Sequence, residues 1–135
     1  MQTNERILAF LKSCACYFLA TVDGEKARVR PMGFALLLSD GSLCFGMGAE
    51  KRCCAQAKSA PWVELCAMNA EKQWLRISGR AVFDDSPETL AEIFAKNEFI
   101  RNKYRPESGL HFAPYRLECA EAYLSAMDGS CERWL

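Results

Sequence analysis

Short runs of alternating apolar and polar residues, separated by turn signals, dominate this sequence. Residues 17–22 are aromatic and β-branched, and Asp23-Gly24, a dipeptide typical of a tight hairpin, follows them. Residues 62–68 and 74–83 form a second such pair around Asn69-Ala70-Glu71-Lys72. Sequential hairpins produce antiparallel pairing, so the pattern predicts a mainly β protein with one antiparallel sheet. A sheet of this size usually closes to hide its edges, and we therefore expect a small barrel.

A long predicted strand, residues 27–38, contains Pro31 and Gly33. Proline cannot donate to a strand ladder and glycine weakens one, so we expect a bulge or a sheet edge there. The turn Ser39-Asp40-Gly41 ends this run. The other predicted strands are 42–47, 115–126 and a short one after Asp128-Gly129, which makes six or seven strands in total.

Three short helices complete the predicted fold. Residues 4–13 place apolar side chains at helical spacing after Thr3 or Asn4, either of which can cap the helix. Residues 50–58 form the second helix, which ends before Pro61. Asp85-Ser86-Pro87-Glu88 opens the third, with proline in its first turn. Residues 99–114 have no clear period and are predicted to be irregular.

Length and charge limit the classes of protein that fit. The 135 residues suit one domain spanning 1–135, with no repeat or linker. The chain has 17 basic and 17 acidic residues, so it lacks the basic excess of a general nucleic-acid binder. A net charge of zero also favours self-association. The apolar runs are too short to span a membrane, so no membrane contact is predicted.

Eight cysteines invite a disulfide framework, but nothing else in the sequence supports one. The N-terminus shows no secretory signal, which predicts a cytoplasmic protein with reduced thiols. The spacings present are Cys-x-Cys and Cys-Cys, which suit neither zinc nor thioredoxin chemistry, so no metal site is predicted. A redox sensor remains an alternative, since Lys51 and Arg52 can lower the pKa of Cys53 or Cys54.

Catalytic side chains are scarce. The single histidine, His111, has no nucleophile near it in the sequence, and Asp84-Asp85 precede a predicted helix, where carboxylates act as caps. We therefore predict no catalytic residue. An enzyme with this sequence would need a cofactor to supply the chemistry.

Cations, in contrast, gather near irregular backbone. Arg28 and Arg30 are two residues apart on one predicted strand, so they share a face. The segment Gly46-Met47-Gly48-Ala49 leads into Glu50-Lys51-Arg52 at a helix N-terminus, where free N–H groups and the helix dipole suit an anion. This arrangement predicts a phosphate site.

Trp74 and Arg76 form a second pair on one face of a predicted strand. An aromatic ring and a guanidinium can bind a flat, electron-poor ring. The same residue types are also favoured at subunit interfaces, and both interpretations stay open.

The ordered set of motifs resembles the pyridoxamine 5'-phosphate oxidase-like, FMN-binding split-barrel proteins, in particular their short single-domain branch. The resemblance covers roughly residues 15–125. It rests on Tyr17-Phe-Leu-Ala-Thr-Val-Asp-Gly, Arg28-Val-Arg-Pro-Met-Gly-Phe, Lys51 with Gln56, Lys58-Ser-Ala-Pro61 and Trp74-Leu-Arg-Ile-Ser-Gly-Arg-Ala-Val-Phe.

This resemblance implies a six-stranded antiparallel Greek-key split β-barrel and a homodimer with FMN between the subunits. Arg30 and Lys51 match the residues that hold the FMN phosphate in the family, and the backbone at 31–33 would line the flavin ring. Trp74 falls where larger oxidases place a flavin-contacting glutamine. The full predicted cofactor set is Arg28, Arg30, Pro31, Met32, Gly33, Met47, Lys51, Arg52, Gln56, Trp74 and Arg76.

The sequence also departs from the family at several positions. Glu50 stands where relatives are often basic, and Met47 and Ala49 replace side chains that commonly assist the phosphate. No counterpart is found to the C-terminal residues that bind pyridoxal phosphate in the true oxidases. The predicted function is therefore an FMN-dependent oxidoreductase acting on another small-molecule substrate. The alternatives are a non-catalytic flavin-storage protein, or a split barrel for haem or a deazaflavin, with His111 as a haem ligand.

Overall fold

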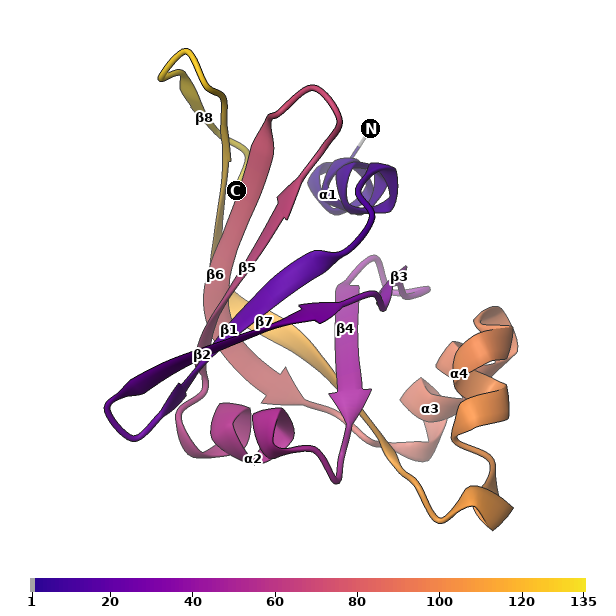
Figure 1. The fold of residues 1–135 in the computed structure, drawn as a ribbon. Coiled ribbons are helices and arrows are strands. Elements are labelled where there is room, and N and C mark those ends of the chain that lie inside the picture. Colours follow the sequence, from indigo (N-terminus) through magenta and orange to yellow (C-terminus); the bar gives the residue numbers. More distant parts are fainter. Residues whose placement is uncertain (1) are drawn as a thin grey trace.

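One strongly curled antiparallel sheet forms the body of the molecule (Figure 1). The structure is a computed structural model that describes residues 2–135. The strand order is β2-β1-β5-β6-β7-β4-β3, and β8 pairs with the far end of β7. The strands are β1 (Tyr17–Asp23), β2 (Lys26–Met32), β3 (Ala35–Leu37), β4 (Leu43–Gly48), β5 (Trp62–Met68), β6 (Trp74–Phe83), β7 (Phe112–Ser125) and β8 (Cys131–Arg133).

The two outermost strands of this order, β2 and β3, are consecutive in the chain. Only Gly33 and Phe34 separate them, so the sheet curls until its edges are joined by a two-residue connection. The hydroxyl of Tyr17 donates to the carbonyl of Phe34 at 2.6 Å and fixes this connection to the start of β1. The architecture is that of a split β-barrel, as predicted.

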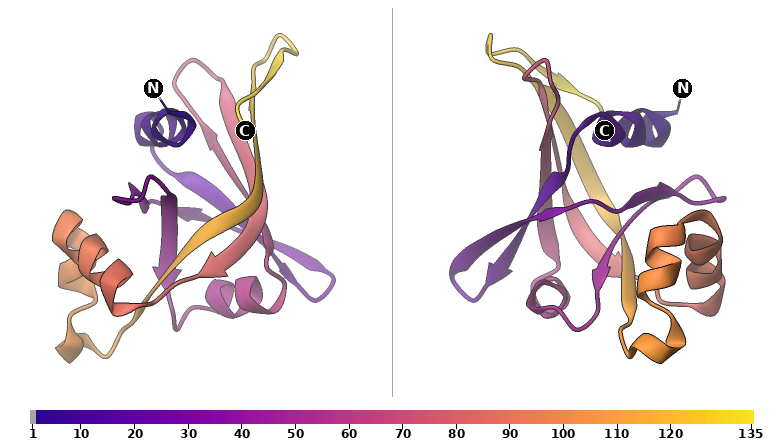
Figure 2. Two further views of the ribbon diagram at one scale, coloured as in Figure 1. Left: turned by 180° about the vertical axis from the view of Figure 1, so that it is seen from behind. Right: turned by 45° about the vertical axis from the view of Figure 1, so that its right-hand side comes forward.

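Helices cover the ends and one side of the barrel (Figure 2). They are α1 (Thr3–Ser13), α2 (Arg52–Ser59), α3 (Pro87–Lys96), α4 (Glu98–Lys103) and the 3-10 turn η1 (Pro106–Ser108). In Figure 1, α1 lies at the top and α2 at the bottom, and the α3–α4 pair lies beside β4. α1 directs Ile7 and Leu11 into the barrel, where both are buried.

Side chains alternate between buried and exposed positions along the strands, and the buried ones form the core. Tyr17, Leu19 and Thr21 of β1 point inward and are buried, as do Val63 and Leu65 of β5. All six residues of β4 are buried, because α3 and α4 pack beside a strand that already faces the barrel interior. The barrel core and the cluster under α3–α4 therefore meet on the two faces of β4.

Most of the predicted elements are confirmed. The hairpin at Asp23-Gly24 forms with Gly24 at φ +64°, a left-handed conformation that suits glycine. The predicted 27–38 strand is interrupted at Gly33-Phe34. The two strands on either side of this interruption, β2 and β3, are edge strands of the sheet, as expected.

Three details of the sequence prediction were wrong. The structure has eight strands rather than six or seven, because the predicted 27–38 strand is divided into β2 and the three-residue β3, while the short strand expected after Asp128-Gly129 is present as β8. Part of the supposedly irregular segment 99–114 belongs to α4. The first helix begins at Thr3, with Gln2 at the cap position, while the Asn4 amide donates instead to the carbonyl of Gly41 at 3.0 Å.

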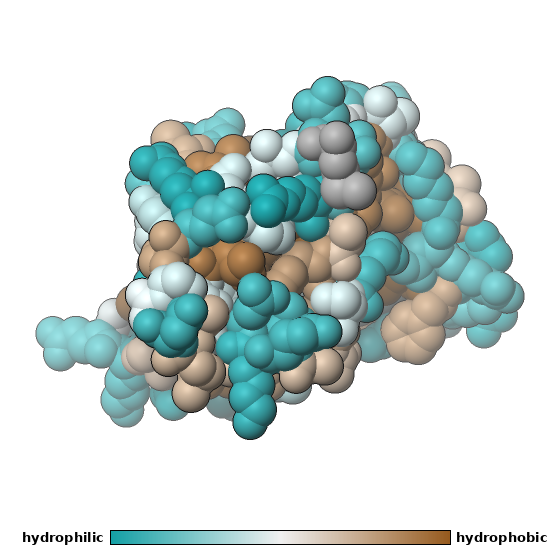
Figure 3. Space-filling model, turned by 90° about the horizontal axis from the view of Figure 1, so that it is seen from above, coloured by the Kyte–Doolittle hydropathy of each residue, from teal (hydrophilic) through white to brown (hydrophobic). Residues whose placement is uncertain are grey.

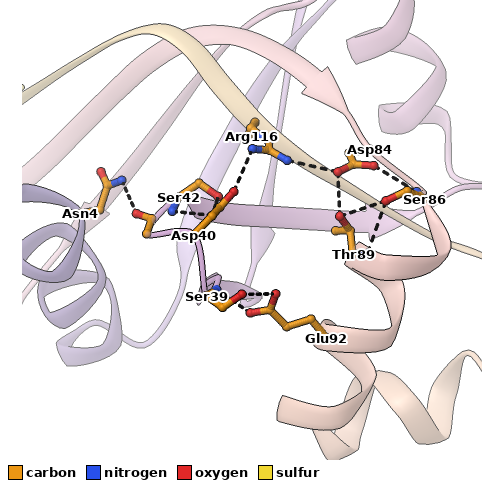
Figure 4. A network of polar contacts seen from close by, with 10 residues as sticks. Asn4, Ser39, Asp40, Ser42, Asp84, Ser86, Thr89, Glu92 and Arg116 are labelled. Atoms are coloured by element: carbon orange, nitrogen blue, oxygen red, sulfur yellow. Dashed lines mark hydrogen bonds and ion pairs between the residues drawn. The ribbon is translucent and has the colours of Figure 1, made fainter.

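A polar network holds α3 against the barrel (Figure 4). Arg116 of β7 lies between Asp40 and Asp84, at 3.5 and 3.1 Å. Asp84 in turn accepts a hydrogen bond from the hydroxyl of Thr89 at 2.7 Å, and Ser86 caps the helix. The network fixes the α3–α4 pair relative to β4 and β7.

The face that carries α1 is mixed in character, with apolar areas showing between polar side chains (Figure 3). Among residues 2–135, the helices are all too short or too polar to cross a lipid bilayer.

Candidate functional site

A pocket of about 460 Å³ opens where the β2–β3 connection, the end of β4 and α4 meet. The barrel supplies one wall and α4 with Tyr104 supplies the other. The lining residues are Pro31, Met32, Gly33, Phe34, Gly46, Met47, Gly48, Lys51, Asn97, Phe99, Ile100, Lys103, Tyr104 and Phe112.

Two glycines of β4 create room for the aromatic wall of this pocket. The ring of Phe112 lies directly over Gly46, so that a Cβ at position 46 would clash with it. The Tyr104 hydroxyl lies 3.2 Å from the position of a Cβ on Gly48, and the Lys51 side chain folds over the same glycine. Glycine at 46 and 48 therefore lets side chains from the 104–112 region reach the strand.

Aromatic rings dominate the apolar part of the pocket. Phe34 and Tyr104 both pack against Phe112, with ring centroids 5.0 and 5.1 Å from its own. Phe99 is 71% exposed at the rim. Such a wall suits a planar, apolar ligand surface.

The charge of the pocket is positive. Lys51 and Lys103 line it, and no lining residue is acidic. Within the described chain, residues 2–135, neither lysine has an ion-pair partner. A ligand with an apolar ring and an anionic group matches this combination.

The hydroxyl of Tyr104 is also free. Tyr104 is only 8% exposed, and its hydroxyl has no hydrogen-bond partner among residues 2–135. Burial raises the pKa of this phenol, with the nearby Glu50 carboxylate as a smaller cause. The hydroxyl therefore stays protonated at neutral pH and can donate to a ligand in the pocket.

Glu50, the acidic residue next to Lys51, is directed away from the pocket. Its carboxylate accepts the backbone N–H of His111 at 3.0 Å and lies 2.9 Å from the Nδ1 atom of that residue. These bonds lower the pKa of Glu50. Glu50 and His111 line a second hollow of about 340 Å³, which shares Phe112 with the Lys51 pocket.

The loop offers an anion fewer N–H groups than the sequence suggested. The Ala49 N–H donates to the carbonyl of His111 at 2.8 Å, and the Lys51 N–H donates to the carbonyl of Gly48 at 3.2 Å. Both groups are therefore already used within the fold, which shifts anion binding toward side chains.

Arg30 belongs to a partly buried polar cluster between β1, β2 and α2, in which Thr21 is the buried member. Its Nη1 donates to the Thr21 hydroxyl at 2.7 Å and to the Leu19 carbonyl at 3.1 Å, and its Nη2 donates to Gln56 Oε1 at 3.0 Å. Thr21 also donates to Gln56 at 2.6 Å. A guanidinium has five N–H donors, so two remain available to a ligand.

Four other predicted residues lie apart from the pocket in the single chain. Arg28 pairs with Asp23 at 3.2 Å, and Arg52 is exposed on α2. Trp74 and Arg76 lie on the outer face of β6, as their alternation predicted, and Arg76 is 3.7 Å from Glu64.

The structure thus brings five of the eleven predicted cofactor residues into one pocket: Pro31, Met32, Gly33, Met47 and Lys51. Sequence reasoning missed most of the α4 side, above all Lys103. A signal was present in Asn97, whose side chain caps α4 by accepting the Ile100 N–H at 2.9 Å.

All eight cysteines are free thiols, and three of them are buried in the core. Burial raises the pKa of Cys44 to about 12 and also raises that of Cys54, against the smaller opposing effect of Lys58. The prediction that nearby cations lower the pKa of Cys54 is therefore wrong. Among residues 2–135, no three His, Cys, Asp or Glu side chains are grouped to hold a metal ion.

Comparison with known proteins identifies the class. The family model for pyridoxamine 5'-phosphate oxidase matches residues 3–117, which is most of the chain. The chain belongs to the pyridoxamine 5'-phosphate oxidase-like split-barrel family, as its motifs predicted. A comparison with curated protein sequences found no match.

Solved structures support this assignment. A NimC/NimA family protein from Clostridium acetobutylicum is 31% identical with a TM-score of 0.84, over 97% of this chain and 90% of that one. A pyridoxamine 5'-phosphate oxidase-related, FMN-binding protein from Nostoc punctiforme is 18% identical (TM-score 0.58; 97% and 91% covered). A haem-binding protein from Mycobacterium smegmatis is 13% identical (TM-score 0.71; 98% and 57% covered). The last two likenesses show the shared fold.

Proposed function

We propose that this protein binds FMN in the Lys51 pocket and acts as a flavin-dependent oxidoreductase on a small-molecule substrate in the cytoplasm. The pocket itself carries the proposal, since it combines aromatic walls with two free lysines and no acidic lining residue. Aromatic walls suit the isoalloxazine ring of FMN, and two lysines without an acidic neighbour suit its phosphate. The FMN-binding relative from Nostoc punctiforme adds support at the level of the fold.

Each part of the cofactor has a residue suited to it. Lys51 pairs with the phosphate, and the two unused N–H groups of Arg30 supply further donors at the adjoining edge of β2. The backbone of 31–33, together with Phe34 and Phe112, provides a surface for the ring. Gln56 orients Arg30 and does not line the pocket.

The bound flavin supplies the redox chemistry by accepting and donating electrons or hydride. The chain's own residues bind and orient it and exclude water from its ring. The pocket lining contains no histidine, aspartate or glutamate to move a proton.

We also propose a homodimer with the cofactor near its interface. The outer face of the sheet exposes Phe18 of β1, Val29 of β2 and Met68 of β5, at 47, 68 and 51%. Trp74 and Arg76 lie on this same face. A second copy of the chain placed on this face would bury these side chains. Trp74 and Arg76 would then approach the flavin bound by the partner subunit.

A visible spectrum of the purified protein tests cofactor binding. We expect flavin absorbance, or a rise in melting temperature when FMN is added to colourless protein, because a ligand selective for the native state stabilises it. A colourless protein that gains neither is evidence against the proposal. With flavin bound, turnover of a panel of electron donors and acceptors separates an oxidoreductase from a storage protein.

The haem alternative depends on His111, which lies with Glu50 outside the Lys51 pocket and is 76% exposed as a side chain. His111→Ala should therefore leave the spectrum of any bound chromophore unchanged. The same spectrum distinguishes a deazaflavin, whose absorbance differs from that of FMN. Light scattering on wild type and Val29→Lys tests the dimer, and we expect the charge to shift it toward monomer.

A further inference from the structure

The wall of the pocket opposite the barrel belongs to a segment that the family motifs do not include. Asn97, Phe99, Ile100, Lys103 and Tyr104 all lie in or next to α4. Two of them carry groups that the fold does not use. The Lys103 ammonium has no ion-pair partner among residues 2–135, and the Tyr104 hydroxyl has no hydrogen-bond partner there.

The Tyr104 hydroxyl lies close to the side chain of Lys51. The Tyr104 hydroxyl lies 3.2 Å from the Cβ position of Gly48, and Cγ and Cε of Lys51 lie 3.5 and 3.6 Å from the same point. The side chains of Lys51 and Tyr104 therefore converge over one glycine, although they are 53 positions apart in the sequence.

Lys103 extends the positive charge along the same wall. Its ammonium lies 5.5 Å from the centroid of the Tyr104 ring, and both residues line the pocket. A lysine in the last turn of a helix can also stabilise the helix by interacting with the helix dipole, which would be a purely structural role. Arg101 already occupies the last turn of α4 and binds the carbonyl of Phe94 at 2.8 Å, so α4 has another residue for that role.

We propose that Lys103 and Tyr104 complete an anion subsite with Lys51, and that this subsite makes the pocket select the phosphorylated flavin, FMN, over riboflavin. The inference rests on the proposed function for the identity of the ligand. Two ammonium groups and one hydroxyl donor suit a phosphate dianion, which accepts several charge-assisted hydrogen bonds. Riboflavin has the same ring but no such group.

The test compares the affinities of FMN and riboflavin, measured by quenching of flavin fluorescence. Lys103→Gln removes the charge and keeps the length of the side chain, and Tyr104→Phe removes only the hydroxyl. We expect each to weaken FMN binding about tenfold and to leave riboflavin binding within about twofold. Added salt should weaken FMN more than riboflavin in the wild type, and less so in Lys103→Gln.

Arg101→Gln is the matched control, because it removes a charge from the same helical turn but from outside the pocket. We expect it to leave the FMN-to-riboflavin affinity ratio unchanged. Thermal melts of all three variants show whether α4 stays folded. The proposal is overturned if Lys103→Gln and Tyr104→Phe keep the wild-type ratio, or if Arg101→Gln lowers it equally.

Failure of the proposed function has a different signature. If wild type binds neither flavin, FMN is not its ligand, and pyrophosphate then probes the anion subsite alone. Stabilisation of wild type by pyrophosphate that is lost in Lys103→Gln supports the subsite. Absence of any stabilisation in wild type contradicts it.

Discussion

The carboxylate of Glu50 is held by His111, with one oxygen 3.0 Å from the backbone N–H and the other 2.9 Å from Nδ1. Glu50 directly precedes Lys51, yet only Lys51 lines the pocket. An acidic residue at this position is therefore compatible with an anion site, because its carboxylate is bound by His111 and does not line the pocket.

Replacing each of these neighbours in turn tests that arrangement. Lys51→Gln removes a cation from the pocket and should weaken FMN binding about tenfold or more. Glu50→Gln should change the affinity by less than about threefold, since the carboxylate points to His111. Fluorescence titration measures both. Equal effects of the two substitutions would show that Glu50 acts on the ligand directly.

The cluster of Arg30, Thr21 and Gln56 makes a prediction about stability. Thr21 is 2% exposed and is both acceptor for Arg30 and donor to Gln56. Thr21→Val preserves the shape and leaves both partners short of a bond, so we expect a loss of about 1–3 kcal/mol in the free energy of unfolding. Urea denaturation measures the loss. Thr3→Val, at a position without such bonds, should be close to neutral.

Alanine substitutions at three glycines around the pocket should lower the stability of the protein by different amounts. A Cβ at Gly46 meets the buried ring of Phe112, and we expect Gly46→Ala to cost about 2–3 kcal/mol. At Gly48 the obstacle is the end of the Tyr104 side chain, which can shift, so about 1 kcal/mol is expected, with weaker FMN binding. Nothing lies within 4 Å at Gly33, and Gly33→Ala should stay within about 0.5 kcal/mol. Melting temperatures in any other order contradict this assignment of contacts.

Asp84 gives the fold a dependence on acid. The Thr89 hydroxyl, followed by the groups of Ser86 and by Arg116, lowers its pKa from 3.8 to about 2. A group with a depressed pKa stabilises the fold above its unfolded value, and this contribution is lost as pH falls from about 4 to about 2. Because the side chain is 30% exposed, we expect Asp84→Asn to cost only about 1–2 kcal/mol at pH 7.

Unfolding of wild type and Asp84→Asn between pH 7 and pH 2 checks this sign. The difference between them should shrink toward the acid end. Asp85→Asn is the control, since Asp85 is exposed and outside the network. A difference that is constant with pH would mean that the charge of Asp84 contributes nothing.

Local signals allowed much of the fold to be predicted, and distant contacts account for what was missed. The Asp23-Gly24 hairpin and the alternation of β6 depend on neighbouring residues, so the sequence reports them directly. The direction of Glu50 depends on His111, 61 positions away, and no spacing rule reports such a contact.

The α4 side of the pocket was missed for a related reason. Six residues are too few for a helical period to stand out, and Pro106 and Gly109 nearby favour an irregular interpretation. Lys103 and Tyr104 become site residues only because the two β4 glycines let the 104–112 segment approach the strand. That approach is a property of the packed molecule.

The joined edges of the sheet have a consequence for how binding is transmitted. Residues 31–34, the end of β2 and its connection to β3, line the pocket on one side, while Gly46–Gly48 line it from the strand paired with β3. No ladder of hydrogen bonds links β2 to β3 among residues 2–135. A ligand that contacts both sides of the pocket would therefore hold these two strands together. Amide hydrogen exchange should accordingly slow in β2 and β3 on binding, while the β5–β6 ladder, already paired on both sides, keeps its protection.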